Sequence, residues 1–299
     1  SLNQIDVSYD KKKQILKGLN LNVEKGELVS LLGPSGCGKS TTLRVVAGFI
    51  DPQGGSFLLD GDDMTKVPVH KRNFGLVFQS YALFPHLSVY DNVAFGLRTR
   101  KMDKGLIDQK VVDILEVCGL TELAQRFPKQ MSGGQRQRIG IARALAAEPE
   151  FIVCDEPISA LDVSIQAQVI NILEELQDKF HFTYLFISHD LSMVRHISSE
   201  VGVMYLGNLI EYAQVDELYD NMLHPYTQSL ISAVPVADPK LAKENQRIIL
   251  EGDVPSPINP APGCPFRSRC RYAKDICGQV KPELKAVNDK HKVACHLFD

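Results

Sequence analysis

One segment constrains the fold of this chain more than any other. Residues 33–40 read Gly-Pro-Ser-Gly-Cys-Gly-Lys-Ser, which is the pattern G-x-x-x-x-G-K-[ST]. An apolar run at 27–32 that suits a buried strand precedes it, and residues 41–48 read as a helix ended by glycine. A strand, a glycine loop and a helix in this order direct backbone N–H groups and the positive end of the helix at one anion. The segment therefore predicts a nucleoside triphosphate site.

Two side chains of this loop have expected chemical roles. Lys39 is expected to reach the β- and γ-phosphates, and the hydroxyl of Ser40 to ligate Mg²⁺. The alternative is a glycine-rich turn that matches by chance, which the flanking strand and helix disfavour. The residues expected to contact the nucleotide here are Gly33, Pro34, Ser35, Gly36, Cys37, Gly38, Lys39, Ser40 and Thr41.

Composition narrows the class of protein. The 299 residues are 44% apolar and 23% charged, with a net charge of −3, which is ordinary for a globular protein with a real core. This charge gives no electrostatic case for nucleic acid, and the run at 11–13 reads as a solvated hairpin tip. No apolar run approaches the ~18–20 residues of a membrane-spanning helix, and no secretory signal is found. We expect a cytosolic protein without structural disulfides.

The order of strand-like and helix-like segments predicts an α/β fold. Residues 2–9, 15–23, 74–78, 151–154 and 184–187 have strand patterns, whereas about 88–146 and 163–178 have a helical period. The simplest interpretation is a P-loop nucleotide hydrolase core with an inserted helical subdomain at about 88–148.

The texture of the chain changes after about residue 235. Prolines are frequent from 235 to 265, at Pro235, Pro239, Pro255, Pro257, Pro260, Pro262 and Pro265, so regular elements there should be short or absent. The last stretch, 264–299, holds four of the seven cysteines. We expect a nucleotide-binding domain over 1–235 and a small irregular cysteine-containing extension over 236–299.

Acidic residues and a histidine follow two of the predicted strands. Asp155 can hold Mg²⁺, and Glu156 is placed to orient or deprotonate an attacking water. A surface acid pair is the alternative, less favoured because four apolar residues precede the pair and Pro157 follows it. His189 follows the strand at 183–188; although such a histidine is more often structural, parallel strands end at one edge of a sheet, so we interpret it as a γ-phosphate contact.

A second helix start has the character of an anion site. Ser132 precedes Gly133, Gly134 and Gln135 and is a natural helix cap, and the two glycines leave backbone N–H groups bare. Considered alone, the segment is also consistent with a well-capped helix and nothing more.

Together these motifs carry a family resemblance. Tyr9, the loop at 33–40, Gln79, the SGGQ sequence at 132–135, Asp155-Glu156, the segment 159–162 and His189 occur in one order over residues 1–215. This order resembles the ATP-binding subunits of ABC transporters, apart from Met131, where the family usually has leucine. The resemblance implies that Tyr9 stacks on adenine and that Gln79 ligates Mg²⁺ and senses the γ-phosphate. It also implies nucleotide contacts from Ser132, Gly133, Gly134, Gln135 and Asp162.

The resemblance further implies a mechanism that needs two chains. Each ATP would lie between the phosphate loop of one subunit and the SGGQ segment of another, identical or not, and hydrolysis would let the halves part. Residues 81–85 belong to the region that, in this family, docks a helix of the membrane permease subunits. Other implied features are a solute-binding protein as an indirect partner, no nucleic acid, and a peripheral location on the cytoplasmic face of the cell membrane.

Two halves of the chain resemble different importers. Residues of about 60–98 resemble ATPases of polyamine, iron and sugar importers, whereas those from about 132 onward resemble oligopeptide/dipeptide permease ATPases. The tail lacks the strand pattern of a β-rich regulatory domain, so we expect an ATPase that powers a di-/oligopeptide importer, with the polyamine, iron or sugar type as the alternative. A soluble ABC ATPase of translation or DNA repair would fuse two ATPase units or carry a coiled coil. The intact Glu156 and His189 disfavour a redox-sensing regulator that only binds nucleotide.

The tail cysteines form a further candidate site. Cys264, Cys270, Cys277 and Cys295 have the spacing C-x₅-C-x₆-C-x₁₇-C, which fits neither the usual zinc pairs nor the ferredoxin run. A proline-rich tail with little core benefits from a cross-link. The resemblance suggests a [4Fe–4S] cluster, with Zn²⁺ joined by His291 or His296 as the second choice and free or disulfide-bonded thiols as the third. Cys37, Cys118 and Cys154 are expected to be packing residues.

Overall fold

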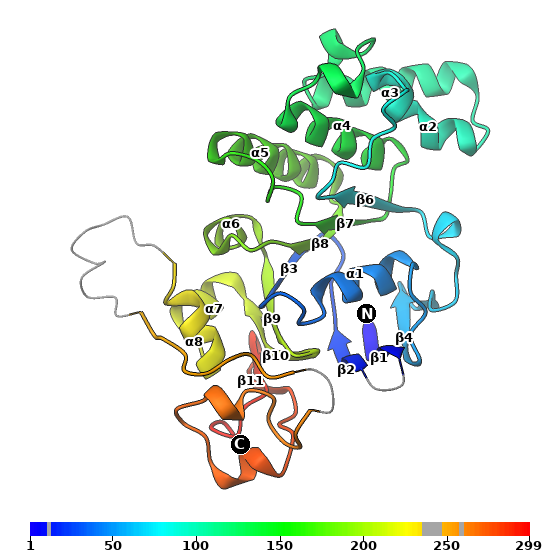
Figure 1. Cartoon of the computed structure of the whole chain (residues 1–299). Helices are drawn as coiled ribbons and strands as arrows, with labels where there is room; N and C mark the ends of the chain where they lie inside the picture. Colours follow the sequence, from blue (N-terminus) through cyan, green and yellow to red (C-terminus); the bar gives the residue numbers. More distant parts are fainter. Residues whose placement is uncertain (11–12, 235–246, 257–259) are drawn as a thin grey trace. The chain divides into compact units, whose positions relative to one another are not determined.

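The structure, a computed structural model, describes residues 1–10, 13–234, 247–256 and 260–299 (Figure 1). These residues form two compact units. The first unit comprises residues 1–22, 29–67 and 189–299, and the second comprises 23–28 and 68–188. The expected irregularity of the tail depends in part on its prolines. Three of these lie outside the described residues: Pro235, Pro239 and Pro257.

The first unit contains an antiparallel sheet with the strand order β2-β1-β4-β5. Its strands are β1 (Leu2–Asp10), β2 (Lys13–Leu21), β4 (Gly54–Leu59) and β5 (Asp62–Asp63). Leu2 pairs with Leu21 and Val7 with Leu16, and all four side chains are buried. The expected strand pair at 2–9 and 15–23 is therefore confirmed.

The same unit contains five further strands in the order β11-β12-β10-β9-β3. The last of these, β3, leads directly into the phosphate loop. They are β3 (Leu28–Leu32), β9 (Glu200–Tyr205), β10 (Asn208–Gln214), β11 (Lys285–Asn288) and β12 (His291–Val293). β3 and β9 are parallel, and the other neighbours are antiparallel. The helices of this unit are α1 (Lys39–Ala47), α6 (Leu191–Ile197), α7 (Val215–Asp220) and α8 (Pro225–Ile231). β3 is buried throughout, as a strand covered on both faces should be.

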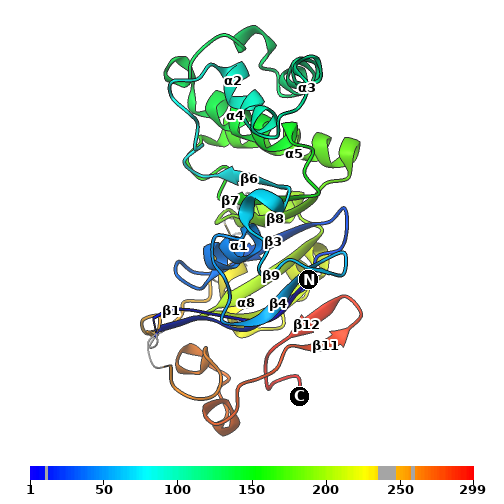
Figure 2. The same cartoon turned by 90° about the vertical axis from the view of Figure 1, so that its right-hand side faces the viewer.

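The C-terminal extension differs from expectation, because it contributes two strands. β12 pairs with β10 through Glu211–Val293 and Ala213–His291. β11 pairs with β12, and the two form the hairpin that Figure 2 shows. The expectation of an irregular extension is wrong at this hairpin, whereas the expected absence of a β-rich regulatory domain stays a prediction. The strands β12 and β11 have only three and four residues, too short to show a period of two, and β10, the partner of β12, lies about 80 positions earlier. In the described parts of 247–284, the only helical elements are the short 3₁₀ turns Arg267–Arg269 and Asp275–Gly278.

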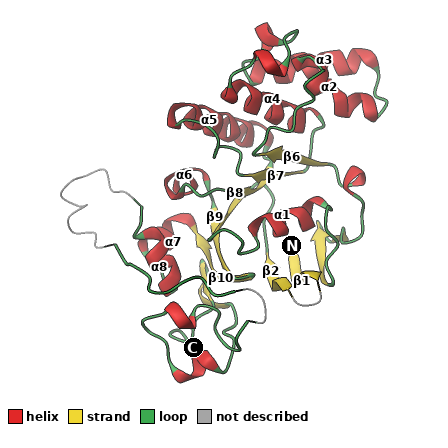
Figure 3. Cartoon of the chain, in the orientation of Figure 1, coloured by secondary structure: helices red, strands yellow, loops and turns green. Residues whose placement is uncertain are grey.

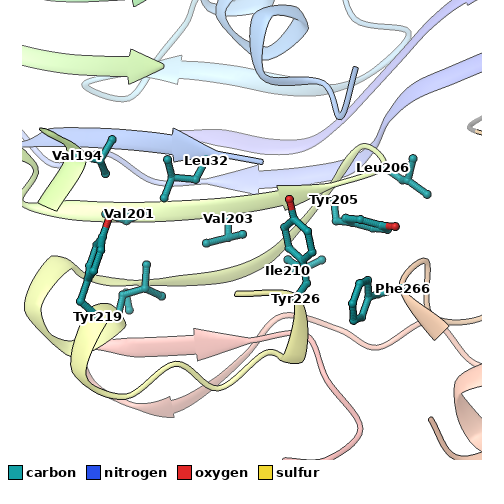
Figure 4. Close-up of a cluster of buried hydrophobic side chains, with 12 residues drawn as sticks. Leu32, Val194, Val201, Val203, Tyr205, Leu206, Ile210, Tyr219, Tyr226 and Phe266 are labelled. Atoms are coloured by element: carbon teal, nitrogen blue, oxygen red, sulfur yellow. The ribbon is translucent and has the colours of Figure 1, made fainter. Parts of the chain in front are cut away.

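An aromatic cluster packs the extension against the rest of the first unit (Figure 4). Phe266 of the extension is 1% exposed and packs against Tyr205 and Tyr226, with ring centroids 5.3 and 5.6 Å away. The two tyrosine rings are themselves 4.9 Å apart. Other members of this core are Leu32, Val194, Val201, Val203, Leu206, Ile210, Ala213, Leu218 and Tyr219.

The second unit contains three parallel strands and four helices (Figure 3). The strands are β6 (Phe74–Phe78), β7 (Phe151–Asp155) and β8 (Thr183–Ile187), in the order β8-β7-β6. The helices are α2 (Val89–Thr99), α3 (Lys104–Val117), α4 (Gly133–Ala146) and α5 (Val163–Phe180). Strands and helices thus occur where the hydrophobic periods place them. None of the helices in the described part of the chain is long and apolar enough to cross a membrane.

Candidate nucleotide-binding site

The phosphate loop depends on glycine for its shape. Gly33, Gly36 and Gly38 have φ angles of 147°, 77° and 109°. A Cβ atom on Gly33 would lie 2.3 Å from the carbonyl oxygen of Met204, and one on Gly38 would lie 2.7 Å from Leu16 Cδ2. Only glycine therefore fits at positions 33 and 38 without a shift of the neighbouring backbone or core.

Lys39 begins helix α1 and turns its side chain back over the loop. Its Nζ donates hydrogen bonds to the carbonyl oxygens of Gly33 (2.7 Å) and Pro34 (3.1 Å), and the residue is buried. Carbonyl oxygens of the loop thus hold a cation beside the N-terminus of a helix, where an anion is favoured. Burial raises the pKa of the neighbouring Cys37 thiol, although the ammonium of Lys39 opposes this shift, which supports Cys37 as a packing residue.

Tyr9 lies beside the first turn of α1. Its hydroxyl is 3.4 Å from Thr41 Oγ1, and 56% of the residue is exposed. Thr42 is buried behind this turn and donates from Oγ1 to the Gly38 carbonyl (3.0 Å). The first unit therefore brings Tyr9, the loop and Thr41 together; the stacking role of Tyr9 stays a prediction.

In the second unit, neighbouring strands end at the same edge. Phe78, the last residue of β6, pairs with Asp155, the last of β7, so Gln79 and Asp155-Glu156 emerge from adjacent strand ends. Gln79 is exposed, whereas both acidic residues are half-buried. This juxtaposition is the one that the strand patterns predict. Carboxylate and amide oxygens at such an edge suit Mg²⁺.

The backbone at Glu156 turns sharply away from β7. Glu156 has a φ angle of 50°, its N–H donates to the Ile187 carbonyl (3.1 Å), and its carbonyl accepts from the Ser159 hydroxyl (3.1 Å). A left-handed conformation at a non-glycine residue is uncommon and is often found at functional sites. His189 lies two positions beyond β8; it is exposed, belongs to the first unit, and its γ-phosphate role stays a prediction.

The SGGQ segment forms the capping box that its sequence indicates. Ser132 Oγ accepts from the Gln135 N–H (3.3 Å), and Gln135 Oε1 accepts from the Ser132 N–H (2.9 Å). A Cβ on Gly134 would lie 2.4 Å from Ile165 Cγ2, so α5 approaches α4 too closely for any other residue there. Asp162 caps α5 in the same way, accepting from the Ile165 N–H (3.0 Å). These contacts define two well-formed helix N-termini, and nucleotide contacts from them stay predictions.

Sequence reasoning missed the residue that shapes the loop at 84–88. The side chain of Asn92, buried in α2, donates to the carbonyl oxygens of Phe84 (3.1 Å), Leu87 (3.1 Å) and Ser88 (2.9 Å) and accepts from the Phe84 N–H (2.9 Å). Both the nitrogen and the oxygen of this amide group therefore help to fix the loop. The sequence contained one signal for this role. Asn92 comes three positions after Val89, so a polar residue falls on the apolar stripe of the helix.

Arginines of α4 hold the residues just before this loop. Arg143 donates to the carbonyl oxygens of Ala82 (2.6 Å) and Tyr81 (3.3 Å), and the Arg136 guanidinium lies 5.1 Å from the centre of the Tyr81 ring. The helix that begins with SGGQ is thus attached to the segment 81–85, where a permease contact is expected.

The four tail cysteines lie in one small module. The Cys264 N–H donates to the Cys277 carbonyl (2.8 Å), and all four thiols are unpaired and partly buried. Burial raises the pKa of Cys264 to about 11, and the charges of Cys277, Cys295 and Cys270 add to the shift. In the described ranges, however, no group of three or more His, Cys, Asp or Glu residues is arranged to hold a metal ion.

Both histidines proposed as zinc ligands have other partners. His291 is buried, with Nε2 2.8 Å from Glu211 Oε1 and Nδ1 3.3 Å from Glu217 Oε1. His296 has Nδ1 2.5 Å from Asp299 Oδ2 and Nε2 3.0 Å from the Val280 carbonyl. Because both nitrogens of each ring are engaged, the structure disfavours a zinc site completed by either histidine.

The fold and the loop define a nucleotide-binding protein of the P-loop class. Residues 16–159 match the family described as ABC transporter, and residues 210–277 match the oligopeptide/dipeptide transporter C-terminal region. The chain is 48% identical over 291 residues to the oligopeptide transport ATP-binding protein AppF of Bacillus subtilis, covering 94% of this chain and 88% of the relative. It is 42% identical over 299 residues to the oligopeptide transport ATP-binding protein OppF of Salmonella typhimurium, covering 97% and 89%.

Two solved structures have a similar fold. One is cbiO1 from Clostridium perfringens, described as part of the ABC transporter complex cbiONQ, with a TM-score of 0.69 and 29% identity over 74% of this chain and 90% of that one. The other is a dimeric post-hydrolysis state of the ATP-binding cassette MJ0796 bound to ADP and Pi, with a TM-score of 0.63 and 28% identity over 72% and 97%. The chain belongs to the ATP-binding proteins of ABC transporters, in the family whose relatives are oligopeptide transport ATP-binding proteins.

Proposed function

We propose that this protein is the ATP-hydrolysing subunit that powers import of di- and oligopeptides through membrane permease subunits. The observation that carries this proposal is the likeness to oligopeptide transport ATP-binding proteins over more than nine tenths of the chain, the stretch near 60–98 included. That extent weighs against the polyamine, iron or sugar alternative. The protein would act as a peripheral subunit on the cytoplasmic face of the membrane.

Within each chain, the first unit would grip the triphosphate. Lys39 would exchange its bonds to the Gly33 and Pro34 carbonyls for phosphate oxygens, at little cost because its position beside the loop is already fixed. Ser40, Gln79 and Asp155 are the residues that would hold Mg²⁺, which neutralises charge on the β- and γ-phosphates. Glu156 would take the proton of the attacking water, and His189 would contact the γ-phosphate.

The second half of each ATP site would come from another copy or a related ATPase. The chain has one phosphate loop and one SGGQ segment, so two chains are needed to place both around one nucleotide. The capped N-terminus of α4 supports this role, because its backbone N–H groups and helix dipole favour the γ-phosphate. Separation of the two chains after hydrolysis would drive the permease.

The role of Glu156 can be tested with Glu156→Gln, using Glu150→Gln, an exposed residue just before β7, as the control. The variant should bind ATP, form a stable dimer by size-exclusion chromatography with light scattering, and lose at least about 100-fold in turnover. A monomer with normal hydrolysis would contradict the assignment.

The peptide substrate can be tested in proteoliposomes that contain the protein with its co-purified membrane subunits and solute-binding protein. Labelled tripeptide should accumulate with ATP, and unlabelled peptides should compete for uptake. Uptake of spermidine, ferric iron or maltose in place of peptide would instead favour the alternative importer class.

We further propose that Cys264, Cys270, Cys277 and Cys295 bind a [4Fe–4S] cluster. The four thiols are unpaired and partly buried in one small module, and thiolates are the usual ligands of such a cluster, which supports this proposal. Protein purified without oxygen should contain about four iron and four sulfide per chain. Cys270→Ser should lose them and Cys118→Ser, at a buried position outside the tail, should retain them. A colourless protein that contains zinc or no metal would refute the cluster.

A further inference from the structure

A large cavity lies in the first unit, apart from the phosphate loop. Its volume is about 1050 Å³, and it is lined by the β1–β2 hairpin, β10 and the C-terminal extension. None of residues 33–40 lines it. A cavity of this size can hold a small organic molecule.

The charge of the lining is mainly positive. Three lysines line the cavity, one from β2 and two from the extension: Lys17, Lys281 and Lys292. Glu283 is the acidic residue among the lining side chains. Lys292 also lies over the Tyr212 ring, with Nζ 5.9 Å from its centre. The cavity therefore offers an electrostatic environment that favours an anion.

Two of these lysines are held close together. Lys281 Nζ donates to the backbone carbonyl oxygen of Lys17 (3.0 Å). This bond holds the ammonium group of Lys281 beside Lys17. Burial lowers the pKa of both ammonium groups, and the charge of Lys281 lowers that of Lys17 further. Asp6 favours the charged form of Lys281, but its Oδ1 already accepts from Gln14 Nε2 (2.8 Å) and the Gly18 N–H (2.8 Å). A bound anion would relieve the repulsion between the two cations.

Asn208 is a buried polar residue of the cavity lining. Asn208 lines the same cavity and is 7% exposed. Its amide nitrogen donates to the carbonyl oxygens of Tyr205 (3.3 Å) and Leu206 (2.9 Å), whereas its Oδ1 has no hydrogen-bond partner among the residues that the structure describes. This oxygen is fully buried, so the anion would contact the lysines rather than Asn208.

We propose that this cavity is a binding site for a small anion whose carboxylate or phosphate group is held by Lys17 and Lys281. Such a ligand would bridge β2 and the C-terminal extension. The site is separate from the proposed nucleotide site and does not depend on the proposed peptide substrate.

The experiment measures binding of two probes, succinate and inorganic phosphate, to the full chain by calorimetry at constant ionic strength without Mg²⁺. The Lys39→Ala background removes the lysine through which phosphate would bind the phosphate loop. One probe should bind saturably at one site per chain, and the probe that binds identifies the group. Lys17→Gln and Lys281→Gln should each weaken binding about tenfold. The control Lys290→Gln removes a charge from an exposed position of the extension outside the cavity and should have no effect.

A second measurement requires no change at the cavity. Lysine acylation followed by mass spectrometry should show that the bound probe protects Lys17 and Lys281 but not Lys290. Absence of saturable binding by both probes, or equal weakening by Lys290→Gln, would overturn the proposal. Equal labelling of Lys17 and Lys281 with and without the probe would also overturn it.

Discussion

The phosphate loop and the C-terminal extension are both largely irregular, but they are held in place by different means. The loop is fixed by its own backbone, through glycines with positive φ angles and the Lys39 ammonium on two loop carbonyls. The extension is fixed by side chains that meet partners far away in sequence, such as Phe266 on Tyr205 and His291 on Glu211. The loop should therefore respond to changes in backbone freedom, and the extension to loss of a packing or ionic partner.

The largest effect is expected for Gly33→Ala. The added Cβ would lie 2.3 Å from the Met204 carbonyl oxygen at a φ angle of 147°, so the loop must move. Affinity for a fluorescent ATP analogue should fall at least about 100-fold, whereas the extension should keep its protection from hydrogen exchange. Gly36→Ala is the matched control, because nothing lies within 4 Å of its added Cβ and only the positive φ angle opposes it. If Gly33→Ala bound the ATP analogue with normal affinity, the claim that backbone conformation fixes the loop would be refuted.

Phe266→Ala should be the largest perturbation of the extension. Removal of this buried ring from between Tyr205 and Tyr226 should destabilise the extension by about 3–5 kcal/mol. Hydrogen exchange should accelerate in β11 and β12, and the control Tyr272→Ala, at a half-exposed residue of the same module, should change little. If Phe266→Ala reduced nucleotide affinity as much as Gly33→Ala does, the phosphate loop and the extension would not be stabilised independently.

A smaller effect is expected from the pH dependence of His291. Burial lowers its pKa, but hydrogen bonds and charges from Glu211 and Glu217 outweigh this and raise the pKa above its ordinary value of 6.5. A raised pKa stabilises the folded state fully below the unfolded value, and this contribution is lost as the pH rises through the folded value. The protection factor of β12, which is the ratio of the intrinsic to the measured exchange rate, should therefore fall as the pH increases from about 6.5 upward.

The control for this prediction must separate His291 from the other histidines. His291→Gln should abolish this pH-dependent fall of the protection factor, and His70→Gln, at an exposed site of the second unit, should not. Burial lowers the pKa of His224 to about 3, so its contribution has the opposite sign and is lost as the pH falls below its unfolded value. Faster opening on acidification of wild type but not of a His224 variant would show that His224, not His291, governs the extension.

The same contrast explains what could be predicted from the sequence. The phosphate loop, the Ser132–Gln135 capping box and the strand end at Asp155 depend on neighbours within a few positions, and each lies where its pattern indicates. The pairing of β12 with β10 depends on a partner about 80 positions away, whereas Asn92 sets the shape of the loop at 84–88 through contacts with backbone groups four to eight positions before it. A buried asparagine has no local period, and a three-residue strand has no measurable alternation, so no sequence pattern specified either feature.

The smallest expected effect is an energetic coupling between the phosphate loop and the C-terminal extension. The Lys17 N–H donates to the Gly207 carbonyl (3.2 Å), and the Gly207 N–H donates to the Cys37 carbonyl in the phosphate loop (2.8 Å). Two backbone hydrogen bonds thus connect the proposed anion cavity to the nucleotide site. A ligand that bridges Lys17 and Lys281 should shift the ATP affinity by a factor of about five or less, at the low end of typical couplings between sites.

This coupling is measured as the Kd of a fluorescent ATP analogue with and without the bound probe of the cavity, in protein with the native phosphate loop. If succinate is the probe that binds, the shift should disappear in Lys281→Gln, whose substitution lies in the extension, and persist in Lys290→Gln. By reciprocity, ATP must change the affinity for the probe by the same factor, which calorimetry checks independently. An unchanged Kd with the cavity saturated would mean that the strand and loop at Gly207 are rigid. In that case ligand binding in the cavity would not change the ATP affinity, although the extension is attached to the ATPase domain.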